Sequence, residues 1–309
     1  MNRHARLARA ALCALSLSGC APSLPRAFEE ERAAAERAYA AGRYDEAAEH
    51  WQAAERAATR RRDQNEAHYR RAAALGRAGR HAEAQALLAE LAQKRPKSSR
   101  AARAAFDRAS IEIEHGNAER GYAELERALA RYPRSGVALG ALSRIAAHRE
   151  EKEGVDATLA YLKKLSREAG GDELREQAGF DFARLLEKHG RDREALAAYL
   201  DLADRFPYPT GALWDDALFM ASLLEEKLGE PRRAILHLER MLKEKEPSSL
   251  QGSYERPRYA AARYRVAELC RDRLGDPRRA AKEFHRVWSE HPTSLLRDDA
   301  LWQAARLER

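Results

Sequence analysis

The stretch GRYDEAAEHW at residues 42–51 decides the fold, because its spacing recurs along the chain. A glycine is followed five residues later by a small residue and nine residues later by a large one. The glycines are Gly42, Gly79, Gly116, Gly190, Gly229 and Gly275. The small residues, which we call the small column, are Ala47, Ala84, Gly121, Ala195, Ala234 and Ala280. The large residues, which we call the large column, are Trp51, Leu88, Leu125, Tyr199, Leu238 and Phe284. The glycine can end a helix in the left-handed conformation at low cost. The small residue lets two helices approach and the large one fills the space beside them, so the spacing predicts repeated helix pairs.

Prolines close most of these units and set their length. They are Pro96, Pro133, Pro207 and Pro292, seventeen residues after a glycine, and Pro247 one residue later. A degenerate unit lies between residues 116 and 190, where Ala157 and Tyr161 fit the two columns if Lys152 replaces the glycine. A long coiled coil would need uninterrupted heptads, which these glycines and prolines exclude.

The pattern resembles the tetratricopeptide repeat over residues 28–309. The resemblance implies an all-α fold, a right-handed α-α superhelix of about seven helix pairs with a C-terminal capping helix. The expected units are approximately 28–62, 63–98, 99–134, 135–171, 172–208, 209–250 and 256–292, with the cap at 293–309. The longer connection at 246–257 is either a contact point or a tolerated insertion.

The N-terminus has the pattern of a secretory leader. Three arginines within residues 1–9 precede an apolar run at 10–17, which is too short to span a membrane. The run closes with Leu17, Ser18, Gly19 and Cys20, which resemble the lipobox of bacterial lipoproteins. The resemblance implies a signal peptide at 1–19, lipid on the Cys20 thiol and a short tether at 20–27. An ordinary signal peptide with a chance cysteine is the alternative.

The residue after the cysteine bears on the destination. In the enteric form of the lipoprotein family, aspartate at that position retains the protein on the inner membrane, and this chain has Ala21. We therefore expect an outer-membrane lipoprotein that faces the periplasm. Inner-membrane or surface-exposed placement stays open.

Charge and cysteine content exclude several classes of protein. The formal net charge is +7, and loss of the leader arginines lowers it to about +4. Acidic and basic residues are interleaved, without the basic, aromatic-bearing face of a nucleic-acid binder, so we expect no nucleic-acid partner. Cys270 is the only cysteine after Cys20, which excludes a disulfide framework and a cysteine-based metal site.

We find none of the short motifs that mark nucleotide-binding, metalloprotease or serine-hydrolase sites. His115 and His189 each precede a turn glycine, where structural use is the simpler interpretation. The acidic pairs at 215–216 and 298–299 open helices, where the helix dipole favours negative charge. The sequence therefore predicts no catalytic residue, no metal and no cofactor.

An aromatic residue recurs ten positions before the turn glycine. The candidates are Tyr69, Phe106, Phe180 and Phe219. In the repeat family this position tends to face the concave groove, where the aromatics could hold an extended peptide or an inserted helix. Burial in the core is the alternative, because aromatic stripes at helical spacing more often pack inside.

The combination of a lipid anchor with helical repeats predicts a non-catalytic scaffold for other envelope proteins. Solenoids use their extended concave surfaces to bind other chains. The best specific form of this hypothesis is a BamD-like factor in outer-membrane protein assembly. A pilotin-type lipoprotein for a secretin or pilus system is one alternative. Cell-wall glycan binding, or an accessory role beside a cell-wall hydrolase, is an alternative of another class.

Overall fold

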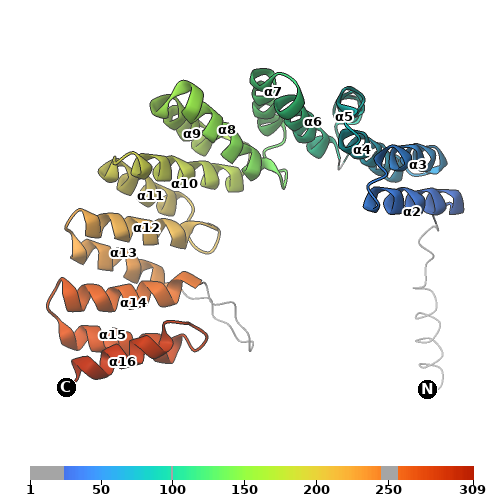
Figure 1. The fold of residues 1–309 in the computed structure, drawn as a ribbon. Helices are drawn as coiled ribbons and strands as arrows, with labels where there is room; N and C mark the ends of the chain where they lie inside the picture. The colour runs from blue at the N-terminus through green and yellow to red at the C-terminus, as the bar shows by residue number, and fades with distance from the viewer. Residues whose placement is uncertain (1–23, 99, 245–256) are drawn as a thin grey trace, which may run out of the picture. The chain divides into compact units, whose positions relative to one another are not determined.

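The computed structural model describes residues 24–98, 100–244 and 257–309. Every regular element in these ranges is an α-helix, and successive helices are joined by short turns into antiparallel pairs (Figure 1). This confirms the predicted all-α repeat fold. The chain divides into two compact units, Met1–Ala128 and Leu129–Arg309. Each is described separately below.

The first unit contains the three N-terminal helix pairs. Its helices are α2 (Arg26–Ala40), α3 (Tyr44–Ala57), α4 (Arg61–Arg77), α5 (His81–Lys94), α6 (Ala101–His115) and most of α7 (Ala118–Arg131). The second unit contains the rest of the repeats. Its helices are α8 (Ala138–Glu153), α9 (Val155–Glu168), α10 (Asp172–Lys188), α11 (Asp192–Arg205), α12 (Trp214–Lys227), α13 (Pro231–Lys243), α14 (Pro257–Asp272), α15 (Pro277–Glu290) and α16 (Arg297–Leu307). We call the first helix of each pair the A helix and the second the B helix.

The turn glycines end the A helices by one shared mechanism. At Gly42, which has φ of 75°, the Arg43 N–H donates to the Ala38 carbonyl at 2.9 Å, and the Gly42 N–H donates to Tyr39 at 3.1 Å. This pair of bonds is the Schellman motif, which needs a left-handed residue at the turn. The same bonds form at Gly79, Gly190 and Gly229, each with positive φ. The local sequence therefore sets the length of each turn.

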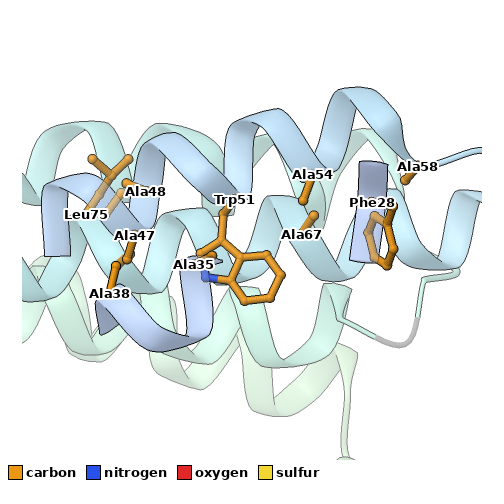
Figure 2. Packing of buried hydrophobic residues seen from close by; sticks show 12 residues of the cluster. Phe28, Ala35, Ala38, Ala47, Ala48, Trp51, Ala54, Ala58, Ala67 and Leu75 are labelled. Atoms are coloured by element: carbon orange, nitrogen blue, oxygen red, sulfur yellow. The ribbon is translucent and has the colours of Figure 1, made fainter. Parts of the chain in front are cut away.

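All twelve residues of the small and large columns are buried. The small residues lie where A and B helices cross. Figure 2 shows this for the first pair, where Ala47 of α3 faces Ala38 of α2 and Trp51 covers the neighbouring surface. Ala54 faces Ala67 of α4 in the same way. Alanine-rich contacts of this kind let the helix backbones pack closely and leave the large residue to fill the remaining space.

Two turns differ from the predicted pattern. Gly116 has φ of −132°, so its turn is not left-handed. The Glu112 carboxylate instead accepts the Asn117 N–H at 2.9 Å, and a Cβ at residue 116 would lie 2.7 Å from that carboxylate. A larger residue here would have to displace the Glu112 carboxylate. In the degenerate unit the left-handed residue is Gly154, with φ of 86°, and the predicted Lys152 lies inside α8.

The register of that degenerate unit was predicted one residue early. Gly154 directly precedes α9, whereas the other turn glycines stand two residues before the next helix. The buried residues are still the fourth and eighth of the helix, so they come four and eight residues after the glycine instead of five and nine. Thr158 and Leu162 are fully buried there, at 0% and 1% exposure, while the predicted Ala157 and Tyr161 are half-buried.

The helix α16 is fully buried along one face only. Ala300 and Ala304 of α16 are fully buried, as expected for a cap that packs on α15. Leu301 and Trp302, on the adjoining face of the helix, are 36% and 55% exposed.

Candidate functional site

The first unit has a groove of about 470 Å³ that is lined mainly by A helices. The lining side chains come from α2, α4 and α6, with two from α5. They include Tyr39, Tyr69, Arg70, Arg77, His81, Arg103, Asp107, Ser110, Glu114 and His115. The backbone is held by the column packing behind it, so the groove is a preformed surface of the repeat stack.

The second unit has a similar groove of about 650 Å³. It is lined by α8, α10 and α12, which are again A helices, and by two residues of α9. Its polar and apolar lining includes Ala146, Glu150, Leu162, Asp181, Arg184, Glu187, Lys188, Met220 and Lys227. The two units therefore present the same face of the repeat as a hollow.

Tyr69 and Asp107 form the polar centre of the first groove. The Tyr69 hydroxyl on α4 donates to the Asp107 carboxylate on α6 at 2.6 Å. Burial and this hydrogen bond raise the pKa of Tyr69 to about 12, so the hydroxyl keeps its proton. Arg103 also binds Asp107, at 3.0 Å. The bonds between α4 and α6 fix the relative position of two neighbouring A helices.

Paired charges line the second groove. Lys188 of α10 binds Glu150 of α8 at 2.6 Å, and this bond, together with the one from His189, lowers the pKa of Glu150. Burial raises the pKa of Asp181, although Gln177 donates to it at 3.1 Å and Arg184 lies 3.9 Å away. Arg184 is 64% exposed, so its guanidinium is available to a carboxylate or a backbone carbonyl of a bound chain.

The predicted aromatic column does not line these grooves, apart from Tyr69. Phe106 is buried at 4% exposure, and Phe180 is half-buried and meets the Tyr199 ring edge-on at 5.4 Å. Phe219 is half-buried as well. Phe106, Phe180 and Phe219 are thus not among the lining residues of these two grooves, and their role in binding a peptide stays a prediction beside the packing alternative.

An arginine from the following repeat covers two of the aromatics. Arg100, just before α6, lies 4.8 Å over the Tyr69 ring and binds Glu66. Arg258, in the first turn of α14, lies 5.0 Å over the Phe219 ring and binds Asp216. In both places the carboxylate stands three residues before the aromatic. The aromatic column thus joins successive A helices through cation–π and ionic contacts.

The positions that line the grooves, which were not predicted from the sequence, lie one residue after the recurring aromatic on each A helix. Arg70, Asp107, Asp181 and Met220 each directly follow a column aromatic and line a groove. One residue corresponds to a rotation of about 100° on an α-helix. Residues four and eight positions after the aromatic, such as Arg184 and Lys188, continue the same stripe. The available signal was the charged residue eight positions after each aromatic, at Arg77, Glu114, Lys188 and Lys227.

Two histidines lie face to face at the first groove. The rings of His81 and His115 have centroids 3.7 Å apart and planes 9° apart, so they are stacked. His189, by contrast, shares its Nε2 with the Glu150 carboxylate at 2.9 Å. His115 and His189, the two histidines that precede a turn glycine, therefore make structural contacts at the ends of α6 and α10.

The predicted lipidation site, Cys20, and the lipobox residues Leu17, Ser18 and Gly19 lie outside the described residues. Among the helices that are described, none combines the length and the apolar content needed to cross a membrane. Cys270 is buried in α14, and burial raises the pKa of its thiol.

Stacked helix pairs with a hollow along their A helices define a solenoid-type binding protein. A family model described as the tetratricopeptide repeat matches residues 66–98 and 261–294. The chain therefore contains tetratricopeptide repeats, in α4–α5 and in α14–α15. The matched model describes helical repeats of the kind found in protein–protein interaction scaffolds, and it indicates no enzymatic family.

Solved structures with similar architecture share little sequence with this chain. A tetratricopeptide repeat protein from Parabacteroides merdae is 17% identical, with 91% of this chain and 99% of that chain covered and a TM-score of 0.39. The C-terminal part of a repeat protein from Cytophaga hutchinsonii is 12% identical, with 86% and 98% covered and a TM-score of 0.48. The TPR2AB domain of yeast Sti1, in a complex with pHSP90, is 14% identical, with 91% and 98% covered and a TM-score of 0.35. No curated protein matches the sequence. Because these TM-scores are low, the fold assignment rests on the helix pairing and the family match.

Proposed function

We propose that this chain is an envelope lipoprotein that holds extended segments of other envelope proteins in its A-helix grooves. The observation that carries the proposal is the second groove, whose exposed Arg184 and paired Glu150 and Lys188 line a hollow of about 650 Å³. An extended peptide has carbonyl and amide groups along its whole length, and such alternating charges can bind both. No aromatic side chain is among the lining residues of the second groove, whereas Tyr39 and Tyr69 line the first, so the glycan-binding alternative is disfavoured at the second groove.

The membrane part of the proposal rests on the sequence. Leu17, Ser18, Gly19 and Cys20 follow a basic and apolar leader, and Ala21 favours delivery to the outer membrane. A diacylated cysteine provides two acyl chains, and two chains anchor a protein stably where one does not. Participation in outer-membrane protein assembly, in the manner of BamD-like factors, is the specific form we propose for this scaffold.

The anchor is tested by fractionating cells that express the Cys20→Ala variant. We expect the wild-type chain in the membrane fraction and the variant in the soluble periplasmic fraction. Cys13→Ala is the matched control, because it removes a leader cysteine outside the lipobox and leaves the chain in the membrane. A Cys20→Ala variant that stays membrane-bound with an unchanged mass would contradict the anchor.

The groove is tested by quantitative co-purification from detergent-solubilised envelopes. Arg184→Glu reverses an exposed charge inside the second groove, so we expect a severalfold loss of the bound envelope proteins. Arg232→Glu makes the same change on the exposed side of α13, and we expect the wild-type set of proteins. Equal recovery with both variants would exclude binding at this groove. Barrel-assembly subunits among the lost proteins would support the specific role, whereas a secretin would select the pilotin alternative.

A further inference from the structure

A second hollow of the first unit lies near the start of its A helices, apart from the groove of Tyr69. Its volume is about 610 Å³. In the part of the chain that the structure describes, four arginines line it: Arg32 of α2, Arg60 and Arg62 at the start of α4, and Arg100 just before α6. We call this hollow the arginine pocket.

The lining of the arginine pocket carries more positive than negative charge. Two carboxylates face the four arginines, those of Asp63 and Glu66. Arg60 binds Asp63 at 2.6 Å, and Arg100 binds Glu66 at 2.6 Å. Each carboxylate is neutralised by one arginine, which leaves two guanidinium groups of the lining in excess.

These two remaining arginines have donors available to a ligand. Arg62 is 85% exposed, and its Nε lies 3.8 Å from the Asp63 carboxylate, beyond hydrogen-bond distance. The Nε of Arg32 is buried and has no hydrogen-bond acceptor among the described residues, since the Glu36 carboxylate is 3.8 Å away. A buried donor without an acceptor costs free energy, so this guanidinium is suited to an anionic group that a ligand brings.

Apolar side chains form the rest of the lining. Phe28 of α2 is buried in the cluster that contains Ala54 and Ala58 (Figure 2), and Leu24 packs partly buried against the same cluster. A free inorganic phosphate has no apolar part to place on this surface. A lipid headgroup, in contrast, joins its phosphate to glycerol and acyl chains. The lining therefore favours a phosphate that is attached to an apolar group.

The arginine pocket is close to the predicted anchor in sequence. Leu24 comes four residues after Cys20, and an extended chain spans at most about 3.6 Å per residue, so the two residues are no more than about 14 Å apart. Acyl chains on Cys20 would hold the pocket at the membrane surface, where the lipid phosphates lie.

We propose that the arginine pocket binds the phosphate of an anionic membrane lipid, with Arg32 and Arg62 as donors and Leu24 beside the apolar part of the lipid. Arginine can bind phosphate through two parallel N–H···O bonds, which also fixes its orientation. The choice of a lipid as the ligand rests on the proposed function, because the anchor places the pocket at the membrane. An acyl anchor and a headgroup site together fix how the first repeats face the membrane, which a single tether does not.

The test is co-sedimentation with vesicles of phosphatidylglycerol or of phosphatidylcholine at physiological ionic strength. It uses the Cys20→Ala chain, purified from the soluble periplasmic fraction, as the parent. We expect the parent to bind the anionic vesicles and not the zwitterionic ones. Combining Arg32→Gln with Arg62→Gln should weaken binding about thirtyfold, because each arginine at an anionic surface contributes to the affinity. Circular dichroism shows whether each variant keeps its helix content.

The matched control is Arg37→Glu, which lowers the net charge by the same amount. Arg37 is an exposed residue of α2 outside the pocket, so this variant should bind nearly as well as the parent. Inorganic phosphate added at constant ionic strength separates the two sources of phosphate, and we expect it to leave the vesicle complex intact.

Three results would overturn the proposal. Equal weakening by the control and by the double variant would show diffuse attraction without a site. Release of the vesicles by inorganic phosphate would assign the pocket to the free ion. A parent that ignores anionic vesicles would leave the pocket to an acidic segment of another protein. Because the parent carries no lipid, none of these results depends on acylation of Cys20, whose failure appears in the fractionation experiment instead.

Discussion

Gly121 of α7 lies so close to Ile113 of α6 that a Cβ on the glycine would come within 2.6 Å of the isoleucine backbone nitrogen. Gly121 is the small-column residue of α7. The column is a requirement of the helix crossing, because backbone atoms on the facing helix cannot move aside as a flexible side chain can.

Gly121→Ala should therefore destabilise the first unit by about 1–3 kcal/mol, the usual cost of overpacking. Gly76→Ala is the control, since its Cβ would meet only side-chain atoms at 3.9 Å. Alanine is the better helix former, so this control should stabilise by about 0.5–1 kcal/mol. Urea unfolding followed by circular dichroism measures both changes. Equal changes in unfolding free energy for the two variants would show that α6 and α7 can move apart to accept the added methyl group.

The register of α9 predicts unequal roles for two neighbours. Leu162 is 1% exposed, and Leu162→Ala should cost about 2–5 kcal/mol of unfolding free energy. Tyr161 is half-buried, with Arg149 4.6 Å over its ring, so Tyr161→Ala should cost only about 1 kcal/mol. Urea denaturation of the two variants checks this order. The reverse order would restore the register predicted from the sequence.

Glu112 should make the first unit sensitive to acid. Its carboxylate accepts hydrogen bonds from Arg120, the Asn117 N–H and Gln85, which lower its pKa from 4.5 to about 2. A lowered folded-state pKa contributes stability above pH 4.5 that is lost as the pH falls towards 2. Glu112→Gln should remove this part of the pH dependence, while the exposed Glu49→Gln should keep it. Thermal unfolding across that pH range measures the difference, and parallel curves for wild type and Glu112→Gln would refute it.

A buried ion-pair network joins α14 to α15. Arg263 is 2% exposed and binds Glu283 and Glu290, each at 2.9 Å. Arg263→Met removes the buried cation but leaves Arg286 within 3.3 Å of Glu283 and 2.8 Å of Glu290, so the cost should lie at the lower end of the range of about 3–5 kcal/mol for breaking a buried ion pair. Replacing Glu283 with leucine in the same chain should recover a large part of that loss. A double-mutant cycle by urea unfolding measures the coupling, and additive effects would show that the two side chains act independently.

The sequence predicted the repeat pattern because turn length and helix packing are local. Gly42 and Ala47 are five residues apart, and one Schellman turn fixes both the end of the first helix and the face of the second. The same reasoning failed at Gly154, where the turn is one residue shorter. A single residue in a turn shifts every buried position of the following helix by one when the count starts at the glycine.

The grooves could be predicted only in part, because they depend on residues far apart in the chain. Tyr69 and Phe219 sit at a helical position typical of a concave surface. Their rings are covered by Arg100 and Arg258, which are 31 and 39 residues away. No local pattern shows that these arginines fold over the aromatics. The groove stripe is therefore rotated by one residue from the predicted column.

The central claim is that the stripe of A-helix residues next to the aromatics holds other envelope proteins. It is tested most directly by photo-cross-linking in living cells from an amino acid placed at Met220, which lines the second groove. Leu236, on the exposed side of α13, carries the same group in the control. We predict discrete cross-links to envelope proteins from position 220 and none from position 236. Equal cross-linking from both positions, or none from position 220, would contradict the account.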